Sequence, residues 1–387
     1  MSEVFDDVDV VRLRRRRTVK WTLYGPDVLA AWVAEMDFDV APVVRDALLE
    51  AVEREDFGYV EGDLSELTTA CAEFLAAEHG WVVPPTRIFA VADVLAGIAT
   101  ALDVCVAPGA QVVVPTPAYP PFFEVVALTG REVVAAPLAT ASGRATLDVD
   151  RVESALRAGA GAVLLCNPHN PTGRAFTADE LRELAALVDR YGARVIADEL
   201  HAPLVYGPSR HVPYTSVSEA AAEHAVTVTS ASKAFNIPGL KCAQIVTTNH
   251  ADAARWRALP LLQAPGPAPL GIAASVAAYR AGRPWLADLR AYLDGNRRRL
   301  RELLTEHVPS VVGTVPEATY LAWLDCSALG IGDPARFFLD HARVALSDGP
   351  PFGPGCEQHV RVNFATSRAL LERIVRAMGD AVRPRLT

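Results

Sequence analysis

The chain has 387 residues, of which 51% are hydrophobic and 21% charged, so it is long enough to bury a sizeable core. Its formal net charge of −9 argues against general binding to nucleic acids or to anionic membranes. The charged N-terminus carries no apolar signal region, and no run of about 18 apolar residues follows, so we expect neither a signal peptide nor a membrane-spanning helix.

Six cysteines are scattered along the chain without a CxxC pair and without a spacing typical of metal ligands. That pattern predicts reduced thiols, a cytoplasmic location and no bound metal. Cys166 precedes a polar loop, and we interpret it as a core residue rather than a nucleophile. The basic run at residues 12–17 is interpreted as a solvated or interface segment.

Between about residues 42 and 280, short apolar runs alternate with amphipathic stretches. The apolar runs predict buried β-strands at 111–115, 132–136, 162–166, 194–198, 225–230 and 243–247. A helix is expected at 177–191, where a threonine N-cap precedes leucines at helical spacing and a glycine follows. Strands separated by helices predict an α/β fold with a mostly parallel sheet that is covered on both faces.

The pattern changes after about residue 283. We expect a long charged helix at 285–307, short strands at 311–315, 320–325 and 359–364, and a closing helix at 367–378. These elements predict a smaller α+β domain. The expected division is an N-terminal arm and part of the small domain at 1–45, a large cofactor-binding domain at 46–282, and the C-terminal small domain at 283–387.

Lys233 is the most informative residue in the chain. It follows a predicted strand and lies among small hydroxyl and apolar residues, in the run Ser230-Ala-Ser-Lys233. Burial lowers the pKa of a lysine and leaves its amine nucleophilic, which is how proteins hold aldehyde cofactors as Schiff bases.

Two further polar residues lie where predicted strands end, the edge at which open α/β sheets bind ligands: Asp198 and Asn170. An electrophilic pyridine cofactor needs an amine for its aldehyde, an anion for its ring nitrogen and donors for its phenolic oxygen. Lys233, Asp198 and Asn170 match these needs as a set. Taken singly, Asp198 is also explained as a helix cap, Asn170 as a turn residue and Tyr119 as a core aromatic.

Further motifs extend the pattern over nearly the whole chain. They are Lys20-Trp21 and the segments 32–38 (WVAEMDF), 57–59 (FGY), 116–119 (TPAY), 170–173 (NPTG), 198–201 (DELH), 230–233 (SASK), 318–324 (ATYLAWL), 346–349 (LSDG) and 361–364 (RVNF). With these motifs the chain resembles fold-type I pyridoxal-phosphate enzymes of the aminotransferase class I/II superfamily. Within that superfamily it resembles the cystathionine β-lyase-like C–S lyases, the MalY/PatB group.

The resemblance implies pyridoxal 5′-phosphate as the cofactor, with Lys233 as the lysine that binds its aldehyde. It implies that Asp198 pairs with the ring nitrogen, that Asn170 bonds the 3-hydroxyl group and that Tyr119 lies against the ring as a second catalytic residue. His201 is also expected at the cofactor. It stands where aminotransferases commonly carry a tyrosine, and the Asp-Glu-x-His pattern is typical of the lyase group.

For the phosphate group, the resemblance implies Ser230 and the backbone amides near Val94 and Leu95, at a helix N-terminus. Tyr59 would reach the phosphate of the neighbouring subunit, which implies a homodimer with shared active sites. Lys241 occupies the place of the superfamily's phosphate-binding arginine. Asp93 departs from the usual Ser/Gly opening of the phosphate cup, and its carboxylate would repel the phosphate unless it points away.

For the amino-acid substrate, the resemblance implies that Arg361 clamps the α-carboxylate through two hydrogen bonds, a geometry that lysine cannot offer. Tyr320 and Trp32 are expected beside the substrate. No nucleic acid, membrane or metal partner is expected.

The set of cofactor residues does not fix the reaction. With Lys233 as the base for the Cα proton, loss of a thiolate from Cβ gives thiol, pyruvate and ammonia, whereas return of the proton to the cofactor gives transamination. The resemblance favours α,β-elimination of L-cystathionine or a related cysteine S-conjugate. An L-amino-acid aminotransferase is the alternative, and a specialised biosynthetic enzyme for decarboxylating deamination or a cofactor-bound regulator are minor ones.

Overall fold

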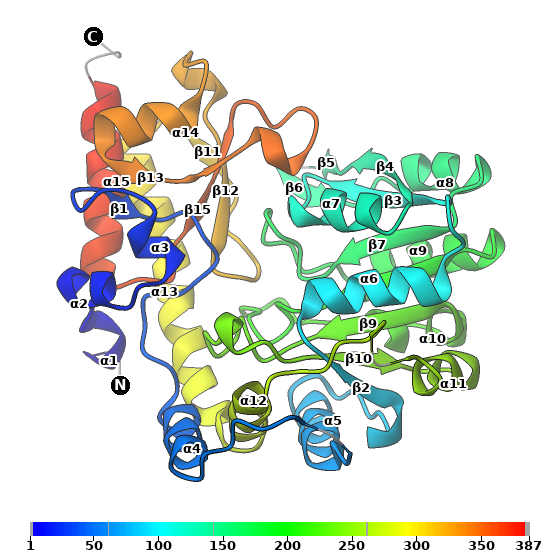
Figure 1. Cartoon of the computed structure of the whole chain (residues 1–387). Coiled ribbons are helices and arrows are strands. Elements are labelled where there is room, and N and C mark those ends of the chain that lie inside the picture. Colours follow the sequence, from blue (N-terminus) through cyan, green and yellow to red (C-terminus); the bar gives the residue numbers. More distant parts are fainter. Residues whose placement is uncertain (1–2, 61, 142, 261, 384–387) are drawn as a thin grey trace.

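The computed structural model describes residues 3–60, 62–141, 143–260 and 262–383 (Figure 1). Its largest sheet has seven strands in the order β2-β10-β9-β8-β7-β3-β4. These strands are β2 (Ile88–Val91), β3 (Gln111–Thr116), β4 (Glu132–Pro137), β7 (Ala162–Cys166), β8 (Arg194–Asp198), β9 (Ala225–Thr229) and β10 (Ala243–Thr247).

From β4 to β9 every neighbouring pair in this sheet is parallel, and β10 and β2 are added in antiparallel fashion. All five residues of β7 and of β9 are buried, because helices cover both faces of the sheet. One face packs against α6 (Val94–Cys105), α7 (Pro121–Leu128) and α11 (His250–Arg257), and the other against α8 (Val149–Arg157), α9 (Ala178–Arg190) and α10 (Glu219–His224). The predicted α/β fold with a mostly parallel sheet is confirmed.

A second sheet has four strands in the order β11-β12-β15-β14. These are β11 (Val312–Gly313), β12 (Leu321–Asp325), β14 (Ser347–Asp348) and β15 (His359–Asn363). Buried leucines of the long helix α13 (Arg283–His307) and of α15 (Arg368–Val382) share one core with β12 and β15. Figure 1 shows α15 on the side of this sheet that faces away from the seven-stranded sheet.

The N-terminal segment packs beside the four-stranded sheet, because β1 (Leu29–Ala30) pairs in parallel with β13 (Val344–Ala345). The helices of that segment are α1 (Glu3–Asp6), α2 (Val10–Arg15) and α3 (Val19–Thr22). The remaining elements are α4 (Pro42–Glu53), α5 (Ser65–His79), α12 (Pro269–Ala281), α14 (Pro334–Phe337) and the hairpin of β5 (Ala139–Ala141) and β6 (Arg144–Thr146). None of the helices in the described ranges has the length and apolarity to cross a membrane.

Six of the seven strands of the large sheet lie where the sequence predicts them, with ends that differ by one residue at most. The sequence misses β2, a strand of only four residues at the sheet edge. Its residues are all apolar, but so short an apolar run does not by itself distinguish a strand from a helix segment. The last helix is predicted too short, because the buried side chains of α15 continue to Val382. The domain boundaries at 45/46 and 282/283 stay a prediction.

Candidate active site

A cavity of about 160 Å³ opens at the carboxyl ends of β7 and β8, next to the first turn of α6. Parallel strands end at the same edge of a sheet, so the loops that follow them converge there. The predicted residues that line this cavity are Lys233, Asp198, Asn170, His201, Tyr119, Val94, Leu95 and Lys241. The fold therefore gathers at one place side chains that are far apart in the sequence.

Lys233 lies in the turn after β9, and its Nζ donates a hydrogen bond of 2.8 Å to the carbonyl oxygen of Ala34. Burial lowers the pKa of this ammonium group from 10.5 to about 8, and the positive charge of Arg361 acts in the same direction. A lysine with that pKa has a much larger free-amine fraction at neutral pH than an ordinary lysine. The cavity thus contains a primary amine that is ready to attack an aldehyde.

The lowered pKa predicts how fast the cofactor-free protein captures pyridoxal phosphate at different pH. Only the neutral amine attacks an aldehyde, so the rate constant is expected to rise with pH and to level off above about 8, rather than above 10.5. Stopped-flow absorbance between about pH 6 and 10 measures this rate, with Nα-acetyl-lysine as the ordinary amine. If the rate constant of the protein depended on pH in the same way as that of Nα-acetyl-lysine, the assignment of Lys233 as the reacting amine would be contradicted.

Asp198 ends β8 and is 4% exposed. Burial raises the pKa of its carboxyl group to about 7, the neighbouring Glu199 adds to the rise, and the Leu200 N–H, 3.0 Å from Oδ1, opposes it. A buried carboxylate with so little compensation is stabilised by a cation placed next to it. Asp198 therefore suits a protonated ring nitrogen.

The first turn of α6 lies at one end of the cavity. Its N-cap residue Asp93 accepts a hydrogen bond from the Ala96 N–H at 2.9 Å, and its other carboxylate oxygen lies 2.8 Å from the Nζ of Lys241. The ion pair with Lys241 compensates the negative charge of the Asp93 carboxylate. The two oxygens of this carboxylate thus contact Lys241 and the first turn of α6. The amides of Val94 and Leu95 open the helix, where the macrodipole favours a phosphate.

Two predicted phosphate ligands lie outside this cavity in the single chain. The Oγ of Ser230 donates to the carbonyl oxygen of Cys242 at 2.6 Å and accepts from the Ser232 N–H at 3.1 Å, and it is Ser232 that lines the cavity. Tyr59 is fully exposed, as a residue that reaches into another subunit would be. The roles of Ser230 and Tyr59 stay predictions.

His201 lines the cavity, and Tyr320, which is buried and not one of the lining residues, packs against it. The His201 side chain is 3% exposed, its Nδ1 has no hydrogen-bond partner in the structure, and its ring meets Tyr320 edge-to-face at 6.1 Å. Burial, together with the positive charges of Lys233 and Arg361, lowers the pKa of His201 to about 3, so the ring is neutral. The Oη of Tyr320 donates to the carbonyl oxygen of Ala34 at 3.0 Å, the same atom that Lys233 contacts. Ala34 carries no chemical signal in the sequence.

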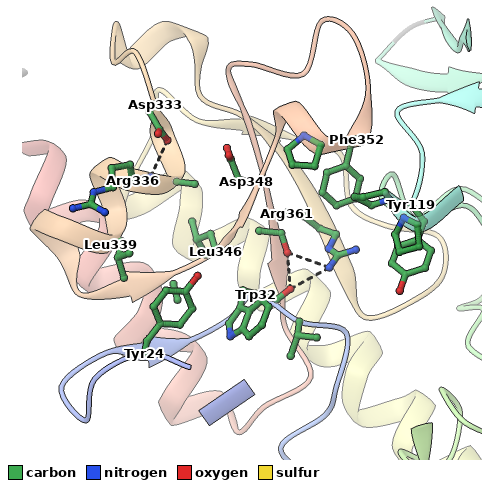
Figure 2. A pocket seen from close by; sticks show the side chains of 17 residues that line it. Tyr24, Trp32, Tyr119, Asp333, Arg336, Leu339, Leu346, Asp348, Phe352 and Arg361 are labelled. Atoms are coloured by element: carbon green, nitrogen blue, oxygen red, sulfur yellow. Dashed lines mark hydrogen bonds between the residues drawn. The ribbon is translucent and has the colours of Figure 1, made fainter. Parts of the chain in front are cut away.

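Arg361 is buried at the boundary between this cavity and a larger one (Figure 2). Its guanidinium donates to the Oδ1 of Asn170 at 2.9 Å, to the carbonyl oxygen of Trp32 at 3.2 Å and to the Oγ of Ser347 at 3.1 Å. All three partners are neutral, and its Nε has no partner in the structure. A buried arginine with neutral partners and a free donor is a site for a carboxylate. Trp32 thus contributes its backbone oxygen here, and Ser347 is a site residue that the sequence did not reveal.

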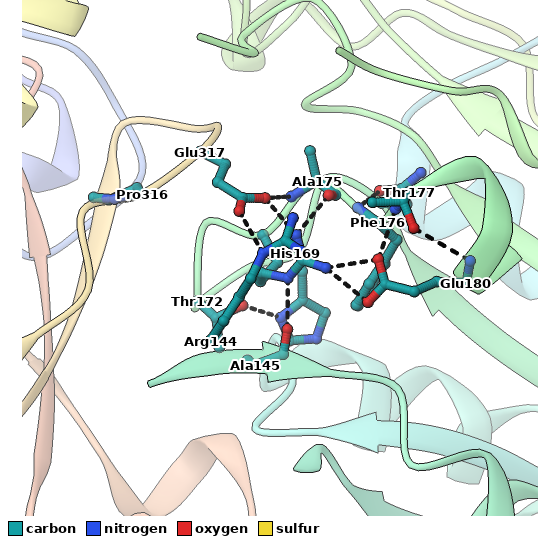
Figure 3. A network of polar contacts seen from close by, with 12 residues as sticks. Arg144, Ala145, His169, Thr172, Ala175, Phe176, Thr177, Glu180, Pro316 and Glu317 are labelled. Atoms are coloured by element: carbon teal, nitrogen blue, oxygen red, sulfur yellow. Dashed lines mark hydrogen bonds and ion pairs between the residues drawn. The ribbon is translucent and has the colours of Figure 1, made fainter. Parts of the chain in front are cut away.

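A second buried arginine fixes the loop that carries Asn170 (Figure 3). Arg174 is 3% exposed, donates two bonds of 2.7 Å to Glu180 and pairs with Glu317, just before β12. The carbonyl oxygen of Gly173 accepts from the Glu317 N–H at 2.9 Å. These contacts connect the loop after β7 to the segment that leads into the four-stranded sheet. They help to fix the position of Asn170 relative to Arg361, with which it shares a hydrogen bond.

Lysine occurs three times in the chain, at positions 20, 233 and 241. Lys20 is buried in an ion pair with Asp37, whose carboxylate lies 2.8 Å away. Lys233 and Lys241 both line the cavity. The other basic residues that carry fixed charge are arginines, which do not form Schiff bases.

The donors present fit pyridoxal 5′-phosphate. The cavity offers a free amine, a buried carboxylate whose pKa is raised, helix-terminal amides next to a lysine, and an unpartnered buried nitrogen on His201. Within the described ranges, no group of three or more His, Cys, Asp or Glu side chains is arranged to hold a metal ion.

Comparison with known proteins places this site in a family. Residues 32–378 match the family described as aminotransferase class I and II. The cystathionine beta-lyase of Corynebacterium glutamicum is 38% identical over 375 residues, 97% of this chain and 99% of its own. A solved structure from Corynebacterium diphtheriae, provisionally described as a PLP-dependent beta-cystathionase, is 43% identical with a TM-score of 0.93, over 97% of this chain and 98% of its own. The PLP-bound C–S lyase of Staphylococcus hominis is 27% identical with a TM-score of 0.92, over 99% of this chain and 100% of its own. The chain belongs to the aminotransferase class I and II family.

Proposed function

We propose that the protein is a pyridoxal-phosphate-dependent C–S β-lyase that cleaves L-cystathionine or related cysteine S-conjugates. The observation that carries this proposal is the Lys233 amine in one cavity with the buried Asp198, next to the Arg361 guanidinium, which bonds Asn170 at the boundary with the larger cavity. The end-to-end similarity to proteins named cystathionine beta-lyase supports the lyase branch of the family. Asp198-Glu-Leu-His201 follows the pattern of that branch.

The cofactor, when bound, supplies an aldehyde for the substrate amine and a protonated ring that withdraws electrons from Cα. Asp198 would hold the ring proton, and the first turn of α6 with Lys241 would hold the phosphate. Asn170 would bond the 3-hydroxyl group while its Oδ1 accepts from Arg361. Tyr119 lines the cavity and would cover the ring face.

Arg361 would bind the α-carboxylate and so orient the Cα–H bond. Lys233, whose pKa is about 8, then removes the Cα proton as general base. The Cβ–S bond breaks with release of the thiol, and water converts the remaining three-carbon enamine to pyruvate and ammonia. One conjugate and one water thus give one thiol, one pyruvate and one ammonia.

A paired assay tests this function. The holoenzyme is incubated with L-cystathionine, and pyruvate and thiol are measured; a second incubation contains an L-amino acid with 2-oxoglutarate, and glutamate is measured. We expect pyruvate and thiol in equal amounts, and little glutamate. Glutamate formation without pyruvate would establish the aminotransferase alternative, which uses the same cofactor residues.

We also propose a homodimer with shared active sites. Its support is a set of exposed apolar side chains in one segment: Leu49, Val52, Phe57, Tyr59 and Val60. A sedimenting mass of one 41.5 kDa chain would contradict it. A cytoplasmic location is proposed as well, because all six cysteines are unpaired.

A further inference from the structure

A second cavity, of about 440 Å³, adjoins the one that contains Lys233. Tyr119 lines both cavities, and Arg361 lies in the wall of the larger one. A substrate whose α-carboxylate is bound by Arg361 has its Cβ near this boundary. A group attached to Cβ through sulfur is therefore placed to enter the larger cavity, which Figure 2 shows with Arg361 and Tyr119 in its wall.

The walls of this larger cavity are aromatic and aliphatic. Figure 2 shows Tyr24, Trp32, Leu339 and Leu346 gathered on one side, with Phe352 near Arg361 on the other. The rings of Tyr24 and Trp32 meet edge-to-face at 5.7 Å and 90°. The indole Nε1 of Trp32 donates to the carbonyl oxygen of Lys20 at 3.1 Å, which fixes the ring in place. Such a surface stabilises apolar groups by removing them from water.

Two segments that are far apart in the sequence, around residues 24–32 and 333–352, build most of these walls. Pairing of Leu29 with Val344 and of Ala30 with Ala345 brings the segment after β1 beside the segment after β13. Trp32 and Leu346 follow directly on these strands. A one-turn π-helix at Phe338–Ala342 adds Leu339. The cavity is therefore a formed part of the fold, and apart from Tyr119 and Arg361 its walls are built by residues outside the cofactor site.

Apart from Arg361, the charged groups of this cavity are Asp333, Arg336 and Asp348, and the only cation among them is paired. Asp333 caps α14 by accepting from the Arg336 N–H at 2.9 Å, and the Nε of Arg336 lies 2.6 Å from Asp340. Asp348 is only partly shielded from solvent. This partial burial and the nearby negative charge of Asp333 raise the pKa of its carboxyl group. Two carboxylates and a paired arginine do not favour a distal carboxylate on the S-linked group.

We propose, on the basis of the lyase function above, that this cavity receives the S-linked leaving group and gives the enzyme a preference for cysteine S-conjugates with a large apolar substituent, such as an arylmethyl or branched alkyl group. An S-methyl group would leave most of the 440 Å³ to water, whereas a benzyl group would fill more of it with apolar surface. A few methylene-sized contacts in an apolar pocket change kcat/KM by about 10- to 200-fold.

The elimination assay compares S-benzyl-L-cysteine with S-methyl-L-cysteine in the holoenzyme. We expect kcat/KM to be at least about 10-fold higher for the benzyl conjugate. Leu339→Trp and, from another element, Ala335→Trp fill the cavity and are each expected to lower this ratio at least about 10-fold. Leu128→Trp, at a position 85% exposed on α7, adds the same ring elsewhere and leaves the ratio unchanged. Melting temperatures show that each variant is folded.

A binding measurement separates failure of the cavity from failure of the lyase function. Replacing sulfur by CH₂ gives L-2-amino-5-phenylpentanoate and L-norvaline, which have no C–S bond to break. Their dissociation constants are read from the absorbance of the bound cofactor. Tighter binding of the phenyl compound by about 10-fold, lost in Leu339→Trp, supports the cavity even if no conjugate yields pyruvate. Equal affinity for both compounds overturns the proposal, whether or not elimination occurs.

Discussion

Lys233→Ala is expected to lower the rate of pyruvate formation by at least about 1,000-fold, because it removes both the amine that binds the aldehyde and the base for Cα. The variant is also expected to lack the visible absorption of the wild-type holoenzyme. The measurements are initial rates at saturating conjugate and an absorbance spectrum after excess cofactor has been removed. A colourless wild type under the same conditions would contradict the cofactor assignment.

The matched control is Lys241→Ala, the other lysine of the cavity. Lys241 pairs with Asp93 at 2.8 Å and is half-exposed, so it is placed to act on the phosphate end rather than on the reacting carbon. We expect this variant to keep the visible band at saturating cofactor and to need a higher cofactor concentration for half-saturation. If Lys233→Ala kept the band and Lys241→Ala lost it, the two roles would be reversed.

Arg361→Lys is expected to lower kcat/KM by about 30-fold or more, mainly through KM, because truncating one partner of a buried, hydrogen-bonded charge pair costs about 2–5 kcal/mol. Lysine keeps the charge but cannot donate two parallel hydrogen bonds, and it cannot reach Asn170 and Trp32 at once. Steady-state kinetics with a cysteine S-conjugate separates KM from kcat.

Arg336→Lys serves as the control for Arg361→Lys, since Arg336 lies in the same larger cavity but is exposed and paired with Asp340. Its kcat/KM is expected to stay within about twofold of wild type, as exposed ion pairs contribute little. A fall in kcat at unchanged KM for Arg361→Lys would show that this arginine acts on the transition state rather than on substrate binding.

The cofactor end of the site was predictable from the sequence because its chemistry resides in a few side chains at strand ends. Asp198 ends one apolar run that predicts a buried strand, and Asn170 follows another. Lys233 follows a third predicted strand. Their convergence follows from parallel pairing. Family resemblance contributed the rest, including Arg361, whose place in the site no local pattern indicates.

Other site residues were not predictable, because tertiary pairing alone brings them together. Ala34 contributes a backbone oxygen to both Lys233 and Tyr320, and a backbone oxygen leaves no trace in the residue type. Ser347 meets Arg361 through the pairing of β14 with β15. Leu339 faces the larger cavity from a π-helix, whose period differs from the 3.6-residue spacing that a sequence pattern tests.

The scarcity of lysine has a consequence for how this protein meets reactive aldehydes. An aldehyde in solution adds to whichever free amines it encounters, and most proteins offer a surface covered with them. Here Lys20 is sealed in its ion pair, and Lys233 and Lys241 both open onto one cavity. Hydride reduction after exposure to a carbonyl compound should therefore mark the catalytic cavity and the chain's amino terminus, and leave the arginine-rich exterior untouched.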